Sequence, residues 1–228
     1  MTVTQALRSF LFMTQMYLMM PLMGLIFLPY ALLTPDGARF ACKTYARWVI
    51  WTARWMVGIR TEVRGTVPSE EVLVVAKHQS FLDIIVLFEA LPASRFIMKR
   101  QLLYTPVIGQ YARRLGCIPV DRGKKGAAVR KMVADVAQER REPGQLVIYP
   151  QGTRVAPGAT VRYKIGAGVL YQDLGQICHP GASRCGAKRR PHWSRRDGRS
   201  DPDPGRALRH QSCTEQLPRG RRGCPGDK

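Results

Sequence analysis

This chain of 228 residues has few acidic residues, no paired cysteine motif and no internal repeat. Its six cysteines form no CxxC pair and no paired Cys/His spacing, so we expect neither a zinc site nor a disulfide framework, and their scatter fits a reducing compartment. Only 16 Asp and Glu stand against 36 Lys and Arg, which leaves a net charge of +20. Such an excess predicts a polyanionic partner: nucleic acid, an anionic membrane surface or a phosphorylated substrate. Because 45% of the residues are hydrophobic, wholesale disorder is excluded.

The last 48 residues, 181–228, lack Val, Ile, Met, Phe and Tyr altogether. They hold 13 Lys and Arg against 5 Asp and Glu, together with seven Gly and five Pro. A segment of this kind buries too little apolar surface to offset its ordering entropy, so we predict a disordered basic tail. The tail has no RGG repeat and only Trp193 to stack a base, so no nucleic-acid partner is expected.

A long uncharged run lies near the start of the chain, where residues 9–33 read SFLFMTQMYLMMPLMGLIFLPYALL. As a helix rising about 1.5 Å per residue, it is long enough to cross a hydrocarbon core of about 30 Å. Pro21, Gly24 and Pro29 favour a bent or re-entrant helix as much as a straight span. The run is longer than the apolar part of a signal peptide, and no small-x-small cleavage site follows it, so we interpret it as a membrane anchor.

Residues 39–58 predict an amphipathic helix in which basic residues recur at three-to-four spacing and tryptophans are interleaved. A basic, tryptophan-rich helix suits the lipid headgroup layer, the alternative being a surface helix of a soluble domain. We therefore predict that residues 1–60 form an N-terminal membrane-anchoring helix pair. The basic residues of the second helix are Arg39, Lys43, Arg47 and Arg54, and its tryptophans are Trp48, Trp51 and Trp55.

Residues 61–180 alternate between short apolar runs and helical patterns. This alternation predicts an α/β domain with a mainly parallel sheet flanked by helices. The expected strands are 71–76, 95–98, 117–120 and 145–149, and the expected helices are 81–91, 105–115, 125–140 and 164–172.

The stretch AKHQSFLDIIVL places His78 and Asp83 five residues apart, after the first strand. On a continuous helix the two side chains would point about 140° apart, but they can meet if His78 lies in the preceding turn. Ser80 fits an N-cap with Asp83 three residues later, as in a capping box. A carboxylate on one imidazole nitrogen leaves the other as a general base. The alternative is that Asp83 only caps the helix and His78 is a loop histidine.

Charged and polar residues also follow three other predicted strands. Ligands bind at the carboxyl ends of parallel strands, so we expect His78, Arg122 and Arg154 to converge there. Two guanidinium groups suit a phosphate monoester. The residues at these strand ends are Lys99, Arg100, Asp121, Arg122, Gln151, Gly152, Thr153 and Arg154.

Four motifs in this order resemble the glycerolipid acyltransferase family, specifically its bacterial 1-acyl-glycerol-3-phosphate acyltransferases, over about residues 10–180. His78 to Asp83 fits the HX4D block, and Lys99 to Gly109 fits K-x-x-L-x-x-x-P-x-x-G. Gly116 to Arg122 fits G-x-I-x-[IV]-D-R, and Pro150 to Arg154 fits P-E-G-T-R with Gln151 in place of the glutamate.

The resemblance implies transfer of a fatty acyl group from an acyl-CoA or acyl carrier protein thioester to the sn-2 hydroxyl of lysophosphatidate, with no cofactor and no metal. His78 would remove the hydroxyl proton and Asp83 would orient the imidazole. Arg122 and Arg154 would bind the acceptor phosphate, with the backbone N–H groups of Gly152 and Thr153 nearby, and Lys99 would contact the substrate. Gln151 would contact the substrate but cannot act as a base.

Two alternatives remain beside this expectation. The same chemistry could act on another lysolipid, such as a lyso-ornithine lipid or a lysophospholipid, or the chain could be an inactive membrane-surface protein that binds lipids. The expected partners are membrane lipids, lysophosphatidate and the thioester. The expected location is the cytoplasmic face of a bacterial inner membrane.

The resemblance weakens where the family continues with a further strand and lobe. Here residues 176–180 read QICHP, and the composition then changes abruptly. We hypothesise that the reading frame is shifted near residues 180–182, the alternative being a genuine tail. Part of the sheet and of the acyl-chain pocket would then be missing.

Overall fold

The computed structural model describes residues 3–121, 125–138, 144–156, 159 and 161–182. The predictions for Arg122 and for the tail from residue 183 onward concern residues outside this described part. Residues 180–182, where a shifted reading frame is hypothesised, lie at its end, and the hypothesis stays untested.

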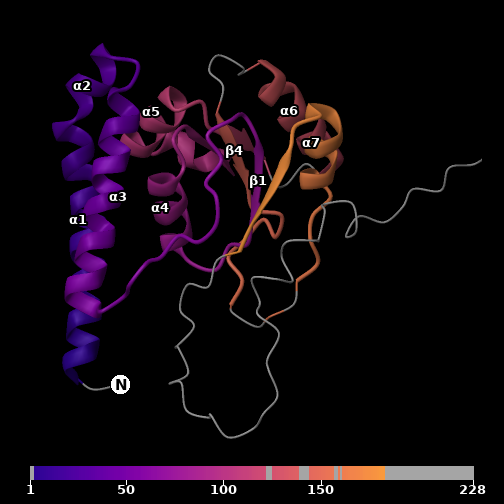
Figure 1. Cartoon of the computed structure of the whole chain (residues 1–228). Coiled ribbons are helices and arrows are strands. Elements are labelled where there is room, and N and C mark those ends of the chain that lie inside the picture. Colours follow the sequence, from indigo (N-terminus) through magenta and orange to yellow (C-terminus); the bar gives the residue numbers. More distant parts are fainter. Residues whose placement is uncertain (1–2, 122–124, 139–143, 157–158, 160, 183–228) are drawn as a thin grey trace, which may run out of the picture. The chain divides into compact units, whose positions relative to one another are not determined.

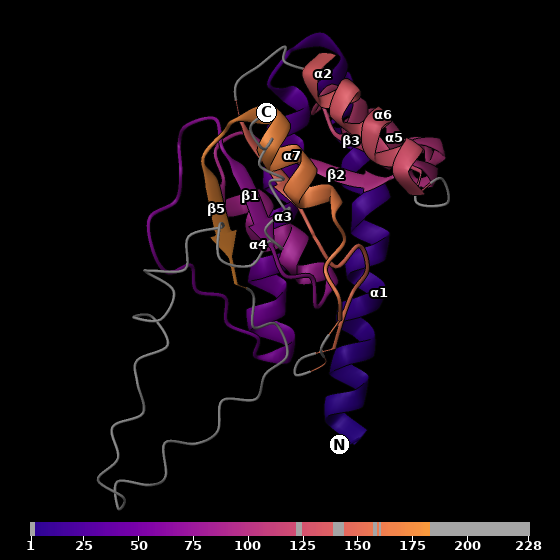
Figure 2. The same ribbon diagram turned by 90° about the vertical axis from the view of Figure 1, so that its right-hand side faces the viewer.

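A five-stranded sheet lies at the centre of the described part (Figures 1 and 2). Its strand order is β3-β2-β4-β1-β5, and each neighbouring pair is parallel. The predicted α/β architecture with a parallel sheet is therefore confirmed. The strands are β1 (Leu73–Ala76), β2 (Ser94–Lys99), β3 (Ile118–Val120), β4 (Gln145–Ile148) and β5 (Cys178–Gly181).

Helices cover both faces of the sheet, because alternate side chains of each strand point to opposite faces. Val74 packs with residues of α4 and α5 in one buried cluster, whereas its neighbour Leu73 packs with residues of α6 and α7 in another. In Figure 1 the two helix layers lie on either side of β1 and β4. The helices are α4 (Phe81–Ala90), the 3-10 helix η1 (Arg100–Tyr104), α5 (Pro106–Arg114), α6 (Lys125–Gln138) and α7 (Gly166–Leu174).

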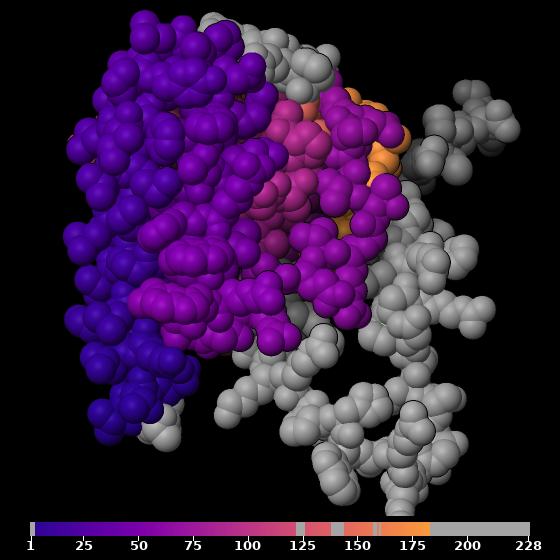
Figure 3. Space-filling view, turned by 60° about the vertical axis from the view of Figure 1, so that its left-hand side comes forward, coloured from indigo at the N-terminus to yellow at the C-terminus, as the bar shows by residue number. Residues whose placement is uncertain are grey.

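Three helices precede the sheet: α1 (Val3–Ile26), α2 (Leu28–Leu33) and α3 (Gly37–Val57). Within the described residues, α1 alone is long and apolar enough to cross a membrane, and only 11% of its most apolar 18-residue window is buried. The chain leaves the helix at Phe27, so the apolar run is interrupted between α1 and α2. Figure 3 views the face where α1 (indigo) and α3 (violet) lie side by side.

The outer face of α1 exposes large apolar side chains, including Leu18, Leu22 and Leu25. Its inner face carries a polar residue, Gln15, whose amide donates to Thr52 Oγ1 (3.0 Å) and accepts from Trp48 Nε1 (2.9 Å), both on α3. Polar groups satisfied between helices and apolar groups turned outward are what a lipid environment favours. The surface of α1 therefore suits contact with a membrane.

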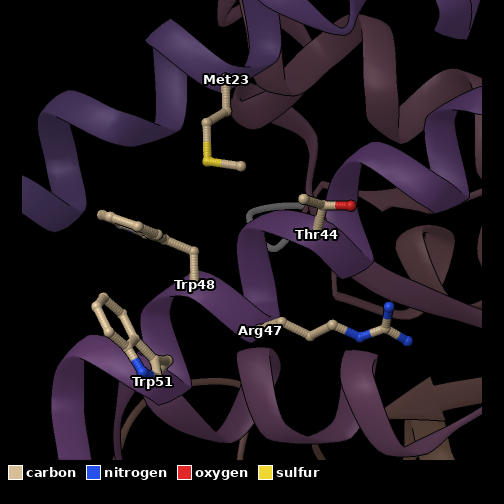
Figure 4. Close-up of a pocket in the computed structure, with 5 residues that line it drawn as sticks. All are labelled: Met23, Thr44, Arg47, Trp48 and Trp51. Atoms are coloured by element: carbon tan, nitrogen blue, oxygen red, sulfur yellow. The ribbon is translucent and has the colours of Figure 1, made fainter. Parts of the chain in front are cut away.

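Two basic side chains of α3 contact α4, although that of Arg47 remains largely exposed. The guanidinium of Arg47 pairs with Glu89 of α4 at 2.9 Å, and the Lys43 ammonium donates to the Glu89 carbonyl at 3.5 Å. In Figure 4 the Arg47 side chain extends away from Trp48 and Trp51, which border a pocket of about 370 Å³ together with α1. Part of the basic face thus serves packing of α3 on α4.

A third apolar cluster joins the helix pair to the sheet domain. Met16 of α1, Val49 of α3 and Ile85 of α4 are all at most 5% exposed and pack together. Because α4 begins directly after the His78 loop, the first three helices are packed against the element that carries the predicted site.

Candidate active site

His78 lies in the loop between β1 and α4, where the sequence places it. Ser80 is the N-cap of α4, and its hydroxyl accepts a hydrogen bond from the Leu82 N–H at 3.0 Å. Asp83 completes a capping box, because its carboxylate accepts the Ser80 N–H at 2.7 Å. The helix start is therefore fixed by hydrogen bonds within three residues.

The capping carboxylate also reaches the histidine. Oδ2 of Asp83 lies 3.2 Å from Nδ1 of His78 and accepts the Gln79 N–H as well. The side chain of Asp83 is fully buried, and that of His78 is 14% exposed. A carboxylate can only accept, so the proton of the imidazole stands on Nδ1 and Nε2 is left as the basic nitrogen.

The backbone of His78 is held from the other side by the loop after β4. Its N–H donates to Oε1 of Gln151 at 2.7 Å, and its carbonyl accepts from the Val155 N–H at 2.9 Å. Gln151 is only 6% exposed. The amide oxygen is thus already used to tie two loops together, while the predicted contact of Gln151 with substrate stays a prediction.

The imidazole ring of His78 is stacked on Tyr149, the residue after β4, with centroids 4.2 Å apart and planes inclined by 21°. The ring centroid of Tyr149 lies in turn 6.4 Å from that of Phe96 in β2. The ring is therefore held at Nδ1 by Asp83 and on one face by an aromatic side chain. Sequence reasoning missed this contact, because an aromatic residue at the end of a buried strand ordinarily indicates core.

The predicted binding residues are not all brought to the same place. His78, Lys99 and Gly152 line one large cavity, whereas Thr153 and Arg154 are exposed and are not among the residues that line it. Arg122 lies outside the described residues. The predicted phosphate contacts of the last three residues stay predictions.

The cavity has a volume of about 800 Å³, which is within the usual range of about 300–1,000 Å³ for ligand sites. Its walls are largely apolar and come from helices on both faces of the sheet. Met20, Met23 and Gly24 of α1 contribute, and the Tyr111 hydroxyl of α5 donates to the Gly24 carbonyl at 2.8 Å. The membrane-type helix therefore forms part of the wall of the cavity that contains His78.

The cysteine and serine side chains in or near this cavity are poorly suited to act as nucleophiles. Burial raises the pKa of Cys42 to about 12 and that of Cys117 to about 11, so both thiols stay protonated near neutral pH. The Ser80 hydroxyl is engaged in capping. In the part of the chain that the structure describes, no group of three or more His, Cys, Asp or Glu could hold a metal ion.

Lys164 is a cavity residue that sequence reasoning did not select. It stands just before α7, and its backbone N–H donates to the Pro150 carbonyl at 2.8 Å. Its side chain lies across Gly152 and lines the cavity together with His78. A lysine at the start of a predicted helix carries no distinguishing pattern, so only the folded chain reveals its position.

Comparison with known proteins gives this site a context. A family model described as Acyltransferase matches residues 59–184. The chain is 28% identical over 190 residues to a 1-acyl-sn-glycerol-3-phosphate acyltransferase of Pseudomonas aeruginosa, covering 82% of this chain and 74% of that protein. It is 35% identical over 119 residues to the human 1-acyl-sn-glycerol-3-phosphate acyltransferase alpha, covering 50% of this chain and 42% of that protein. It therefore spans less than half the length of the human relative.

A solved structure shares the fold. The crystal structure of the 1-acyl-sn-glycerophosphate acyltransferase PlsC from Thermotoga maritima superposes with a TM-score of 0.60 at 18% identity. The match covers 77% of this chain and 72% of that one.

Proposed function

Because the chain belongs to the acyltransferase family, we propose that it transfers a fatty acyl group from a thioester to the sn-2 hydroxyl of 1-acyl-glycerol-3-phosphate, giving phosphatidate. The thioester is acyl-CoA or an acyl group carried by acyl carrier protein. The observation that carries the proposal is that His78, paired with the buried Asp83, lies on the wall of a large apolar cavity. The names of the Pseudomonas and human relatives support the choice of acceptor.

In the proposed reaction, Nε2 of His78 takes the proton of the acceptor hydroxyl as its oxygen attacks the thioester carbonyl. The new C–O bond forms, the C–S bond breaks, and the leaving thiolate receives the proton from His78. Asp83 holds Nδ1 by its 3.2 Å contact and stabilises the imidazolium formed on the way. The protein's further contribution is to hold the two substrates close together.

The surroundings of the pair suit a lipid reaction. Apolar walls reaching from His78 to α1 can accommodate acyl chains, and α1 has the length and composition of a membrane span. We place the protein at a membrane, with the active site on the cytoplasmic side of a bacterial inner membrane, where the thioester is made available.

The test is acyl transfer to radiolabelled lysophosphatidate in vesicles, with acyl-CoA and acyl carrier protein donors in parallel. The wild-type chain is compared with His78→Ala and with His179→Ala, a matched control on β5 that does not line the cavity. We expect phosphatidate from the wild type and the control, and a loss of about 10²- to 10⁴-fold for His78→Ala. Equal rates for all three proteins would overturn the proposed role of His78.

A panel of acceptors separates the alternatives. Product from a lyso-ornithine lipid or another lysophospholipid, but not from lysophosphatidate, would keep the chemistry and change the substrate. No product from any acceptor, with anionic vesicles still bound, would favour an inactive lipid-binding protein. Sequencing of the coding DNA around residues 180–182 would then test whether another frame restores apolar alternation.

A further inference from the structure

The side chain of Lys164 occupies a position that Gly152 leaves free. Gly152 has φ of +68°, and a Cβ built on it would lie 2.8 Å from both Cε and Nζ of Lys164. A larger residue at 152 would therefore be strained in its backbone and would also collide with the lysine. Gly152 thus lets the ammonium group approach the loop that follows β4.

The same loop is tied to His78. Gln151 accepts the His78 N–H, and the N–H of Lys164 donates to the Pro150 carbonyl. Lys164 and His78 are therefore attached to adjacent residues of one short segment, and both line the cavity. A ligand that fills this cavity can therefore contact both the His78 imidazole and a positive charge.

The charge of Lys164 has no carboxylate partner in the part of the chain that the structure describes. Among the described residues, the side chain of Lys164 makes no ion pair with a carboxylate within 4 Å. The described side chains that line the cavity include two ammonium groups, of Lys99 and Lys164, and no carboxylate. An apolar cavity with two cations and no anion of its own favours an anionic ligand.

We propose that the Lys164 ammonium binds the phosphate of the acceptor lipid and thereby positions its hydroxyl at His78, an inference that rests on the proposed function. A thioester of coenzyme A also carries phosphates, so phosphate is the shared chemistry. The acceptor is the better source because its phosphate and reacting hydroxyl stand on adjacent carbons. The diphosphate of coenzyme A is separated from the thioester by the whole pantetheine arm.

The test compares Lys164→Met and Lys164→Arg with Arg162→Met, a matched control that removes the same charge from an exposed residue not lining the cavity. Loss of one charge-assisted hydrogen bond predicts a KM for lysophosphatidate about 10- to 100-fold higher in Lys164→Met. The KM for the donor should stay within about twofold. Lys164→Arg keeps the charge and should recover most of the affinity, whereas Arg162→Met should match the wild type.

Two donors distinguish the two phosphate sources. If Lys164→Met raises the KM for acyl-CoA but leaves turnover with acyl carrier protein as donor unchanged, Lys164 binds coenzyme A, and the proposal is wrong. Unchanged KM values for both substrates would also overturn it.

A binding measurement keeps the inference separate from the reaction. Equilibrium binding of radiolabelled lysophosphatidate to the full chain in detergent micelles needs no turnover. If the wild type binds but forms no product, and Lys164→Met binds at least about 10-fold more weakly, the phosphate site stands while the proposed reaction fails. Equal binding by the two proteins overturns the site.

Discussion

Replacement of Asp83 by asparagine separates its two duties, capping α4 and holding His78. Asp83 Oδ2 accepts three N–H groups, from the imidazole of His78 and from the backbone of Gln79 and Ser80. Asparagine has the same size, but its side chain has one oxygen and one amide group. Its oxygen can take the place of Oδ2 but is neutral, so the three hydrogen bonds lose their charge assistance and the His78 imidazolium loses its counter-charge.

The expected magnitudes follow from these contacts. A hydrogen bond to a charged group contributes about 1.5–3 kcal/mol and a neutral one about 0.5–1.5 kcal/mol, so Asp83→Asn should lower the free energy of unfolding by about 1–3 kcal/mol. A domain stable by about 5–15 kcal/mol would remain folded. The loss of the carboxylate that stabilises the imidazolium should lower kcat by about 10²- to 10⁴-fold.

The assay pairs urea unfolding with acyl transfer, and Ser80→Ala is the control. That change removes the hydroxyl that caps the Leu82 N–H and leaves the His78–Asp83 contact in place. It should cost about 1 kcal/mol of stability with little change in kcat. If Asp83→Asn loses stability but keeps the activity of Ser80→Ala, then Asp83 is only a helix cap and the reasoning is refuted.

Three further predictions concern stability and reactivity. Gly109→Ala should lower the free energy of unfolding by about 1–3 kcal/mol or more, as urea titration would show, because a Cβ there would lie 2.1 Å from the Leu103 carbonyl oxygen, a backbone atom. Gln151→Leu should cost about 1–3 kcal/mol in the same assay, because the His78 N–H loses its acceptor, whereas Gln151→Glu keeps an acceptor and should cost less; equal losses would contradict the structural role of the amide oxygen. Burial raises the pKa of Cys117 from 9.0 to about 11, so peptide mapping after alkylation of the folded protein at pH 8 should find this thiol protected. Because the unfolded thiol ionises first, its contribution to stability should be lost as pH rises from about 9 to about 11, and a pH series of urea titrations would detect the fall.

The sequence alone was sufficient to predict hydrogen bonds whose donor and acceptor lie within a few residues of each other. Ser80 and Asp83 predict their capping box because both partners lie within one helical turn. The same turn geometry allows the contact of Asp83 with His78, which the structure then shows. Alternation of short apolar runs with helical patterns likewise predicts the parallel sheet, since parallel strands need crossover connections.

Buried polar residues in strands show where local reasoning ends. Gln145 begins β4 and is completely buried, which the sequence alone gives no reason to expect. Its amide accepts from the Ala93 N–H and donates to the Glu70 carbonyl, both at 2.9 Å. The polar side chain is thus satisfied by two segments remote in sequence, which no local pattern reports.

The sequence by itself determined the order of the motifs, predicted the parallel α/β class and allowed the contact of His78 with Asp83, because each depends on periodicity or on contacts within one turn. Only the tertiary structure decided that Tyr149 stacks on the imidazole, that Gln151 ties the His78 loop, and that Lys164 reaches the same cavity. The physical reason is the strand order, in which β4 lies beside β1 although two strands separate them in the chain. Contacts across that pair join residues more than seventy positions apart, and their partners are chosen by packing of the whole sheet.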